Sequence, residues 1–157
     1  AIATGVISSD GELFNFGVNA YKTAVDDIDQ RGAFPKEMAR NEMSIHYQSF
    51  ALQPLIPIAA FAERQRIPLY SYKSPTGHTI ADAVNFLGKA VANPSIVKVY
   101  TPEEQNIDSN APDFFACLEF YRRQFPHREL PASLVEALKK PTFATRLGGS
   151  TTVIAGR

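Results

Sequence analysis

Apolar residues recur every three or four positions along several stretches of the chain, which is the spacing of one face of a helix. The clearest stretch, Glu12–Ile28, follows Asp10, a residue type that caps helices, and precedes Gly32, which can end a helix with positive φ. The same spacing predicts three further helices, over Thr79–Val91, Asp113–Gln124 and Ala132–Lys139. The chain also reads as helix from its first residue without a capping residue before it, which indicates a piece of a longer protein.

The most apolar stretch, Met43–Arg64, has apolar residues around almost its whole circumference, which predicts a helix buried at the centre of the fold. Pro54 and Pro57 each lack a backbone N–H, so we expect a kink or a restart of the helix there. Asn93–Asn110 is polar and contains proline, which predicts a loop with one short turn, and Thr151–Ala155 is the only stretch that reads as a strand. Helices joined by proline- and glycine-containing loops indicate an all-α fold.

The overall composition narrows the classes of function. The 157 residues have the length of a single domain, 1–157, and 16 Lys+Arg against 16 Asp+Glu give a formal net charge of zero. This balance argues against a nucleic-acid binder, although a local site for an anion can lie within a neutral total. No stretch approaches the ~20 apolar residues of a membrane span, so we expect no membrane partner. Cys117 is the only cysteine, which excludes an internal disulfide and a cysteine-rich metal site; we expect it to be a buried small hydrophobe.

The residues with the most useful chemistry gather around Arg40 and Tyr47, which lie seven positions apart. If that segment is one helix, both side chains leave the same face about 10 Å apart along the axis. A guanidinium can hold a carboxylate through two parallel hydrogen bonds, and positive charge lowers the pKa of a nearby phenol. The pair can therefore hold an acidic substrate and move a proton. On spacing alone this signal is weak, because a tyrosine on an apolar helix is more often a core residue and an arginine there is usually a salt-bridge partner.

At these residues the sequence resembles a known family. Residues 32–61 read GAFPKEMARNEMSIHYQSFALQPLIPIAAF, which is similar to the alginate lyases of polysaccharide lyase family 5, with their pattern G-x-F-P-x-E-x-x-R followed by H-Y and A-L-x-P-L. Three more stretches agree with the family in the same order: TGVISSDGELFNFGVNAYKTAV, LEFYRRQFP and RLGGSTTVIAG. The resemblance therefore covers nearly the whole chain.

The resemblance implies both a fold and a function. The fold would be an incomplete (α/α) toroid of helical hairpins, of which this chain is the C-terminal part, with at most one short strand near its C-terminus. The function would be β-elimination on an acidic polysaccharide, alginate or a related polyuronate, with polymannuronate preferred. It would leave 4,5-unsaturated uronate ends without a metal or another cofactor. Family members are periplasmic or secreted bacterial proteins, and no nucleic acid or membrane is implied as a partner.

Several positions of this chain match site residues of the family. Arg40 matches the arginine that helps to neutralise the substrate carboxylate, and Tyr47 matches the tyrosine that protonates the leaving oxygen and can also take the C5 proton. His46 aligns with the histidine just before that tyrosine, as structural support or as a substrate contact. Arg146, in the RLGG segment, can contact a sugar carboxylate or be a surface partner, and Lys36 can line the entrance of the cleft.

Two departures from the family leave the function open. The family has an Asn-His pair upstream of the segment that resembles Ala1–Val6, so we expect this chain alone to be poorly active and to need the missing N-terminal half of the same protein. Gln48 and Ser49 stand where the family commonly has His-Asn. Because Gln48 adjoins the predicted acid, we assign it to substrate binding and leave polyglucuronate open as the polymer. A non-catalytic module that binds uronate polymers and a helical partner domain that binds none stay open as well.

Overall fold

A computed structural model describes residues 1–107, 111, 113–127 and 129–155. Helices dominate, and the only strands in these ranges are two short ones near the C-terminus, so the predicted all-α class is confirmed. The α-helices are α1 (Ile2–Ser8), α2 (Gly11–Asp26), α3 (Pro35–Met38), α4 (Ser44–Arg64), α5 (Ile80–Ala92), α6 (Leu118–Gln124), α7 (Ala132–Ala137) and α8 (Thr151–Ile154). The 3-10 turns are η1 (Asn41–Met43), η2 (Leu69–Ser71), η3 (Pro94–Val99) and η4 (Thr145–Leu147), and the strands are β1 (Phe143–Ala144) and β2 (Gly149–Ser150).

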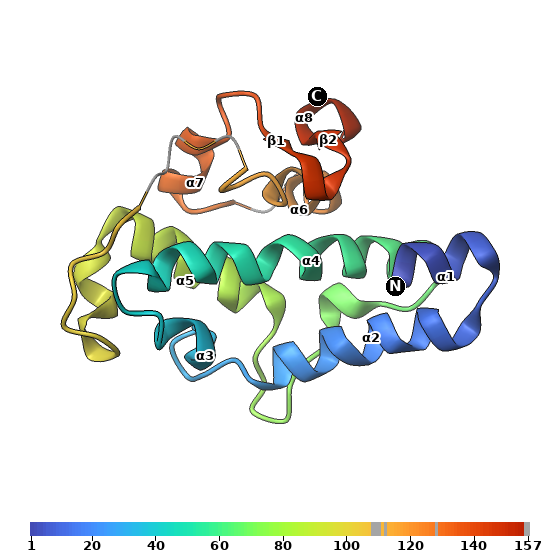
Figure 1. Ribbon diagram of the computed structural model, residues 1–157, viewed down its shortest axis with the longest axis horizontal. Helices are drawn as coiled ribbons and strands as arrows, with labels where there is room; N and C mark the ends of the chain where they lie inside the picture. Colours follow the sequence, from blue (N-terminus) through green and yellow to red (C-terminus); the bar gives the residue numbers. More distant parts are fainter. Residues whose placement is uncertain (108–110, 112, 128, 156–157) are drawn as a thin grey trace.

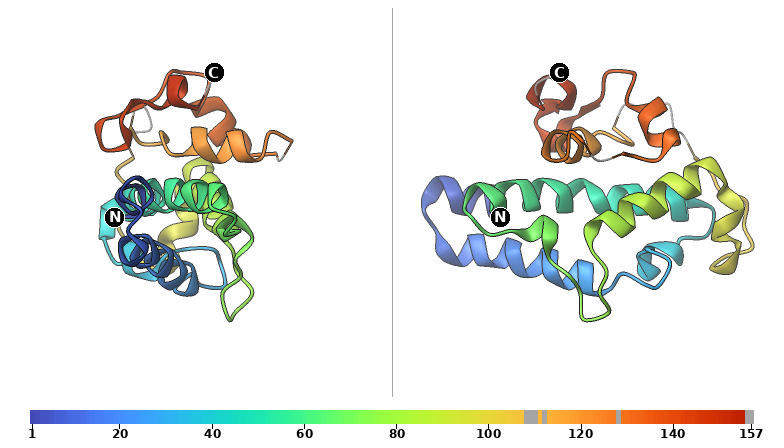
Figure 2. Two further views of the ribbon diagram at one scale, coloured as in Figure 1. Left: turned by 90° about the vertical axis from the view of Figure 1, so that its right-hand side faces the viewer. Right: turned by 180° about the vertical axis from the view of Figure 1, so that it is seen from behind.

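The helices form a larger and a smaller layer (Figures 1 and 2). Helices α1, α2, α4 and α5 make up the larger layer, and α6, α7, the two strands and α8 lie together across α4 and α5. Helix α4 packs against α2 and α5 within its own layer and against α6 in the smaller layer. Side chains such as Leu52, Ile56 and Ala59 are fully buried along it. No helix in the described ranges is both long enough and apolar enough to cross a lipid bilayer.

The central helix is continuous, so of the kink or restart predicted at its prolines, the restart is wrong, and the kink stays a prediction. Helix α4 runs from Ser44 to Arg64 through Pro54 and Pro57. Each proline removes one backbone donor, but Pro54 is exposed and Pro57 half-buried, while the opposite side of the helix is held by the core. Packing therefore maintains a helix whose local sequence favours an interruption.

The ends of α2 and α5 follow from short-range signals, as predicted. Asp10 accepts hydrogen bonds from the backbone N–H groups of Glu12 and Leu13, both at 3.0 Å. Thr79 begins α5 in a reciprocal capping box with Asp82, whose Oδ2 accepts from the Thr79 backbone N–H at 2.7 Å. Gly32 has a φ of 90°, the left-handed conformation predicted for it.

Two predictions for the smaller layer are wrong. The helix expected over Asp113–Gln124 begins only at Leu118. The carbonyls of Asp113 and Phe114 accept hydrogen bonds from side chains of α4, those of Gln53 and Ser49, so α4 fixes this segment as a set of turns. The predicted Ala132–Lys139 helix is present and ends at Ala137.

The strand predicted over Thr151–Ala155 is instead the short helix α8. Its threonine hydroxyls face inward, where that of Thr151 bonds the hydroxyl of Thr142 at 2.8 Å and that of Thr152 donates to Glu119. The strands β1 and β2 pair antiparallel just before it, with Phe143 opposite Ser150. The predicted loop over Asn93–Asn110 contains η3, and its last three positions, 108–110, lie outside the described residues.

Two buried tyrosines in this core differ in one hydrogen bond, which leads to a stability prediction. The Tyr70 hydroxyl donates to the Ile56 carbonyl at 3.0 Å, whereas the buried Tyr21 hydroxyl has no partner among the described residues. Burial raises the pKa of both phenols, so each is neutral. Tyr70→Phe should cost about 1 kcal/mol of unfolding free energy, whereas Tyr21→Phe should be neutral or stabilising by up to ~1 kcal/mol. Urea unfolding of the two variants compares them, and a larger loss from Tyr21→Phe would contradict the assignment.

Candidate active site

Arg40 and Tyr47 meet, although not in the way that their spacing suggested. They do not share a helix, because α3 ends at Met38, η1 intervenes and α4 begins at Ser44. Asn41, directly after Arg40, has a φ of 54°, which turns the chain. The turn places the Arg40 Cζ 4.8 Å from the centroid of the Tyr47 ring. The guanidinium therefore lies against the phenol in a cation–π contact rather than two turns away from it.

The Arg40 side chain is half exposed and weakly paired. Its Nε lies 3.5 Å from Oε2 of Glu37, one turn earlier, and 53% of the side chain is accessible to solvent. Exposed ion pairs of this kind contribute little, about 0–1 kcal/mol, so an arriving carboxylate can compete for the guanidinium. The geometry suits an arginine that binds an acidic group at the Tyr47 ring.

Three rings form what we call the aromatic strip: His46, Tyr47 and Phe50, on the first turns of α4. The ring centroid of Tyr47 lies 5.5 Å from that of His46 and 6.0 Å from that of Phe50, and the His46 and Phe50 rings stack at 6.3 Å. Arg146, from η4 in the smaller layer, places its Cζ 4.8 Å from the Phe50 centroid. The strip thus has a guanidinium over Tyr47 and another over Phe50. Of the predicted site residues, the structure brings together Arg40, His46, Tyr47 and Arg146.

A cavity of about 300 Å³ adjoins this strip between α4 and the smaller layer. Its wall combines an imidazole, two phenyl rings, a carboxylate and a guanidinium with polar side chains. The residues that line it are His46, Ser49, Phe50, Gln53, Asp113, Phe114, Ala144, Thr145 and Arg146. Its volume is at the lower end of the range for small-ligand pockets. Sequence reasoning missed Phe50, which its position four residues after His46 on the same helix face could have indicated.

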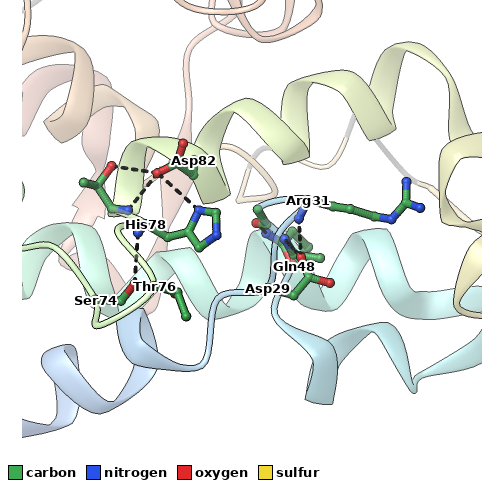
Figure 3. Close-up of polar contacts among 10 residues, drawn as sticks. Asp29, Arg31, Gln48, Ser74, Thr76, His78 and Asp82 are labelled. Atoms are coloured by element: carbon green, nitrogen blue, oxygen red, sulfur yellow. Dashed lines mark hydrogen bonds and ion pairs between the residues drawn. The ribbon is translucent and has the colours of Figure 1, made fainter.

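Gln48, predicted to contact substrate, is fully buried. It lies next to Asp29 and Arg31, at the turn before α3 (Figure 3). Its Oε1 accepts from the Phe34 backbone N–H at 3.0 Å, and its Nε2 donates to the carbonyls of Gly32 and Ala83, both at 3.3 Å. The amide is therefore used entirely inside the protein. In this structure Gln48 supports the turn that leads into α3, and the assignment to substrate contact does not fit its burial.

Asp29 holds the same turn from the other side, and sequence reasoning missed it. Its Oδ1 accepts from the backbone N–H groups of Arg31 and Ala33, at 2.8 and 2.9 Å. The Tyr100 hydroxyl donates to its Oδ2, and burial together with this hydrogen bond raises the pKa of Tyr100. The signal was available, because aspartate side chains in turns commonly bond the backbone two residues further on, and Arg31 holds that position. The turn is thus fixed before the chain reaches Arg40.

Lys36 lies apart from the aromatic strip. Its Nζ pairs with Oδ2 of Asp27, and this hydrogen bond raises the pKa of the lysine. Both residues line another groove, of about 470 Å³, between α2, α3 and α4. The structure therefore does not bring Lys36 to the cavity beside His46.

A second cluster contains serine, histidine and aspartate but has no catalytic geometry (Figure 3). Ser74 Oγ accepts from the backbone N–H of His78 at 3.0 Å rather than contacting the imidazole ring. Asp82 Oδ2 lies 4.0 Å from His78 Nδ1 and is engaged by Thr79 as the cap of α5. These contacts close a loop and begin a helix. Among the residues that the structure describes, no group of three His, Cys, Asp or Glu side chains is placed to hold a metal ion.

Comparison with known proteins relates this geometry to a family. The family model described as alginate lyase matches residues 1–97. The alginate lyase of Pseudomonas syringae pv. syringae (strain B728a) is 32% identical over 155 residues, which cover 98% of this chain and 40% of that enzyme. The crystal structure of alginate lyase A1-III from Sphingomonas species A1 matches with a TM-score of 0.88 at 38% identity, covering 98% of this chain and 43% of that one.

A variant of alginate lyase A1-III in complex with a tetrasaccharide matches similarly, with a TM-score of 0.87 at 38% identity, over 98% of this chain and 42% of the other. The chain therefore spans less than half the length of the relatives it matches. Because the structural matches cover 98% of this chain, the likeness extends over both layers of the fold.

Proposed function

This chain belongs to the alginate lyase family, and from that premise we propose that it contributes Arg40 and Tyr47 to the cleavage of alginate-type polyuronates by β-elimination. The observation that carries the proposal is the contact between the two side chains, 4.8 Å from guanidinium carbon to ring centroid at an accessible surface. It puts a cation that can bind a carboxylate beside a group that can transfer a proton. We propose polymannuronate as the preferred polymer and a periplasmic or secreted location, both in line with the family resemblance.

The reaction needs three events at one sugar ring. The carboxylate on C5 is neutralised, which makes the C5 proton acidic; a base removes that proton, and its electron pair forms the C4–C5 double bond. The bond between C4 and the leaving oxygen then breaks, and the oxygen receives a proton. Arg40 is suited to the first event because its guanidinium can form two parallel hydrogen bonds to a carboxylate.

Tyr47 is suited to the proton transfers. In mannuronate the C5 proton and the leaving oxygen lie on the same side of the ring. In its phenolate form, the Tyr47 oxygen can therefore take the proton from C5 and then donate it to the leaving oxygen, which regenerates the phenolate and leaves no net change in the protein. The nearby Arg40 guanidinium stabilises the negative charge that develops during this transfer. No step in this scheme calls for a metal ion.

Arg146 and His46 extend the site along the polymer. Because Arg146 lies over Phe50, it can bind the carboxylate of a second sugar residue while the first is held at Arg40. His46 contacts the rings of both Tyr47 and Phe50, lines the cavity, and can donate a hydrogen bond to a sugar hydroxyl. In this arrangement substrate binding depends on two guanidinium groups that belong to different layers.

Binding measurements test this arrangement on the chain itself. Arg40→Ala and Arg146→Ala should each weaken the binding of a mannuronate oligomer by ~10- to 100-fold, because each removes hydrogen bonds to a charged group. Lys139→Ala removes an exposed lysine that pairs with Glu136 outside the site, and should leave the affinity unchanged. Isothermal titration calorimetry measures all four proteins. Equal affinities in wild type and both arginine variants would contradict the proposed site.

Turnover is measured separately, through the ultraviolet absorbance of the unsaturated product on polymannuronate, polyguluronate and polyglucuronate. We expect slow turnover by the 157 residues alone, because the family also uses an Asn-His pair from an upstream segment. None of His46, His78 or His127 matches the histidine of that pair. A preference for polyglucuronate would reassign the polymer. Saturable binding without product, even in a longer polypeptide that carries this chain, would indicate a non-catalytic module.

A further inference from the structure

Helix α4 lacks a cap from its own sequence. Met43 occupies the N-cap position and makes no side-chain hydrogen bond to the helix. The first N–H groups of a helix have no partner within it and need one from elsewhere. Here the backbone N–H of Ile45 donates to Oε1 of Gln105 at 3.1 Å, from a residue 60 positions further along the chain.

Gln105 binds the preceding turn with its other amide atom. Its Nε2 donates to the carbonyl of Asn41 at 2.8 Å, so one side chain ties the left-handed first residue of η1 to the first turn of α4. The next residue adds a backbone bond, since the Asn106 N–H donates to the carbonyl of Glu42 at 2.7 Å. The loop after η3 therefore closes on the segment from Asn41 to Ile45.

That segment is the connection between Arg40 and Tyr47. Arg40 immediately precedes Asn41, and Tyr47 lies in the first turn of the helix that Gln105 caps. Rotating α4 or relaxing the turn at Asn41 would move the guanidinium relative to the ring. Among the described residues, the Ser44 side chain also holds this turn, since its hydroxyl donates to the carbonyls of Met38 and Asn41 at 2.8 Å.

We propose that Gln105 is a positioning residue, which holds Arg40 against the Tyr47 ring by clamping the turn and the helix start between them. The inference rests on the proposed function, because it concerns the same two side chains. Gln105 acts through the backbone of Asn41 and Ile45 and does not itself contact the substrate. Its removal should therefore change the geometry of the pair more than the stability of the fold.

Gln105→Met tests this, because methionine has a similar length and cannot form either hydrogen bond. Gln65→Met is the matched control, at the exposed far end of the same helix. Three quantities are compared with wild type. The first is the midpoint temperature of thermal unfolding, and the second is the NMR shift that the Tyr47 ring current induces in the Arg40 side-chain protons. The third is the affinity for a mannuronate oligomer, measured at a temperature at which each variant is folded. We expect Gln105→Met to lose most of the ring-current shift and ~5- to 20-fold in affinity, and Gln65→Met to match wild type.

The outcomes separate this inference from the proposed function. If Gln105→Met keeps the Arg40 shift and the wild-type affinity while its thermal midpoint falls, Gln105 is only a structural cap and the inference is wrong. If the wild-type chain binds no mannuronate oligomer, the proposed function fails, but the ring-current shift still decides whether Gln105 positions the pair. Faster hydrogen exchange at the Ile45 amide in Gln105→Met alone would confirm that the long-range cap has been removed.

Discussion

Tyr47→Phe should lower the rate at which unsaturated uronate ends form by ~100- to 10,000-fold and leave the affinity for a mannuronate oligomer unchanged. The range is what a positioned acid–base group contributes. Phenylalanine keeps the ring, so the contact with Arg40 and the edge of the aromatic strip remain, and only the proton-transferring oxygen is lost. The loss should therefore appear in kcat rather than in KM.

The measurement uses this chain and, in parallel, a chimera in which it replaces the matching 155 residues of the Pseudomonas syringae relative, in case turnover by the chain alone is too slow to quantify. Tyr72→Phe is the matched control, because its hydroxyl bonds Asp26 at 2.9 Å outside the aromatic strip. Its rate should equal that of wild type. An active Tyr47→Phe protein with a normal rate would show that another group transfers the proton.

Gly32→Ala should cost about 3 kcal/mol or more of unfolding free energy, the largest effect that we expect from adding a single methyl group. Gly32 has a φ of 90°, where a Cβ costs about 1–2 kcal/mol. A Cβ there would also lie 2.5 Å from the backbone carbonyl oxygen of Asp82, which cannot move without shifting the start of α5. Because the group that the Cβ would contact is backbone rather than a flexible side chain, the steric strain adds to the cost of the positive φ.

Gly77→Ala isolates the first of these costs. Gly77 has nearly the same φ, 88°, but a Cβ there would meet no atom within 4 Å. Gly77→Ala should lower the free energy of unfolding by only about 1–2 kcal/mol. Chemical denaturation of both variants gives the difference, which measures the crowding at Asp82. Equal losses would mean that the turn at Gly32 relaxes freely.

Local signals in the sequence explain the elements that were predicted well. Helices α2 and α5 have capping residues, Asp10 and Thr79, within three positions of the groups that they bond. The failures involve partners from distant parts of the chain. Phe114 precedes α6 without joining it because Ser49 takes its carbonyl, and Thr151 is helical while its hydroxyl bonds that of Thr142. A pattern of neighbouring residues cannot reveal such contacts.

The site was predicted in part, for a similar reason. The resemblance to a family identified Arg40 and Tyr47, and the structure brings them together, but by a turn rather than along one helix. Gln48 was assigned to the site because it follows Tyr47, yet successive residues on a helix point about 100° apart. That rotation takes Gln48 into the core, where it bonds Phe34, and leaves Tyr47 half-buried. The clamp by Gln105 lies too far along the sequence for periodicity to indicate it.

The two guanidinium groups of the site belong to different layers, Arg40 to the chain before α4 and Arg146 to η4. A polyanion that binds both would act as a non-covalent cross-link between the layers. By thermodynamic linkage, oligomer at about 100 times its dissociation constant would stabilise the folded state by roughly 2.7 kcal/mol. Any local opening that carries Arg146 away from Phe50 would be suppressed by up to that amount, so the bound polymer should protect the smaller layer from proteolysis.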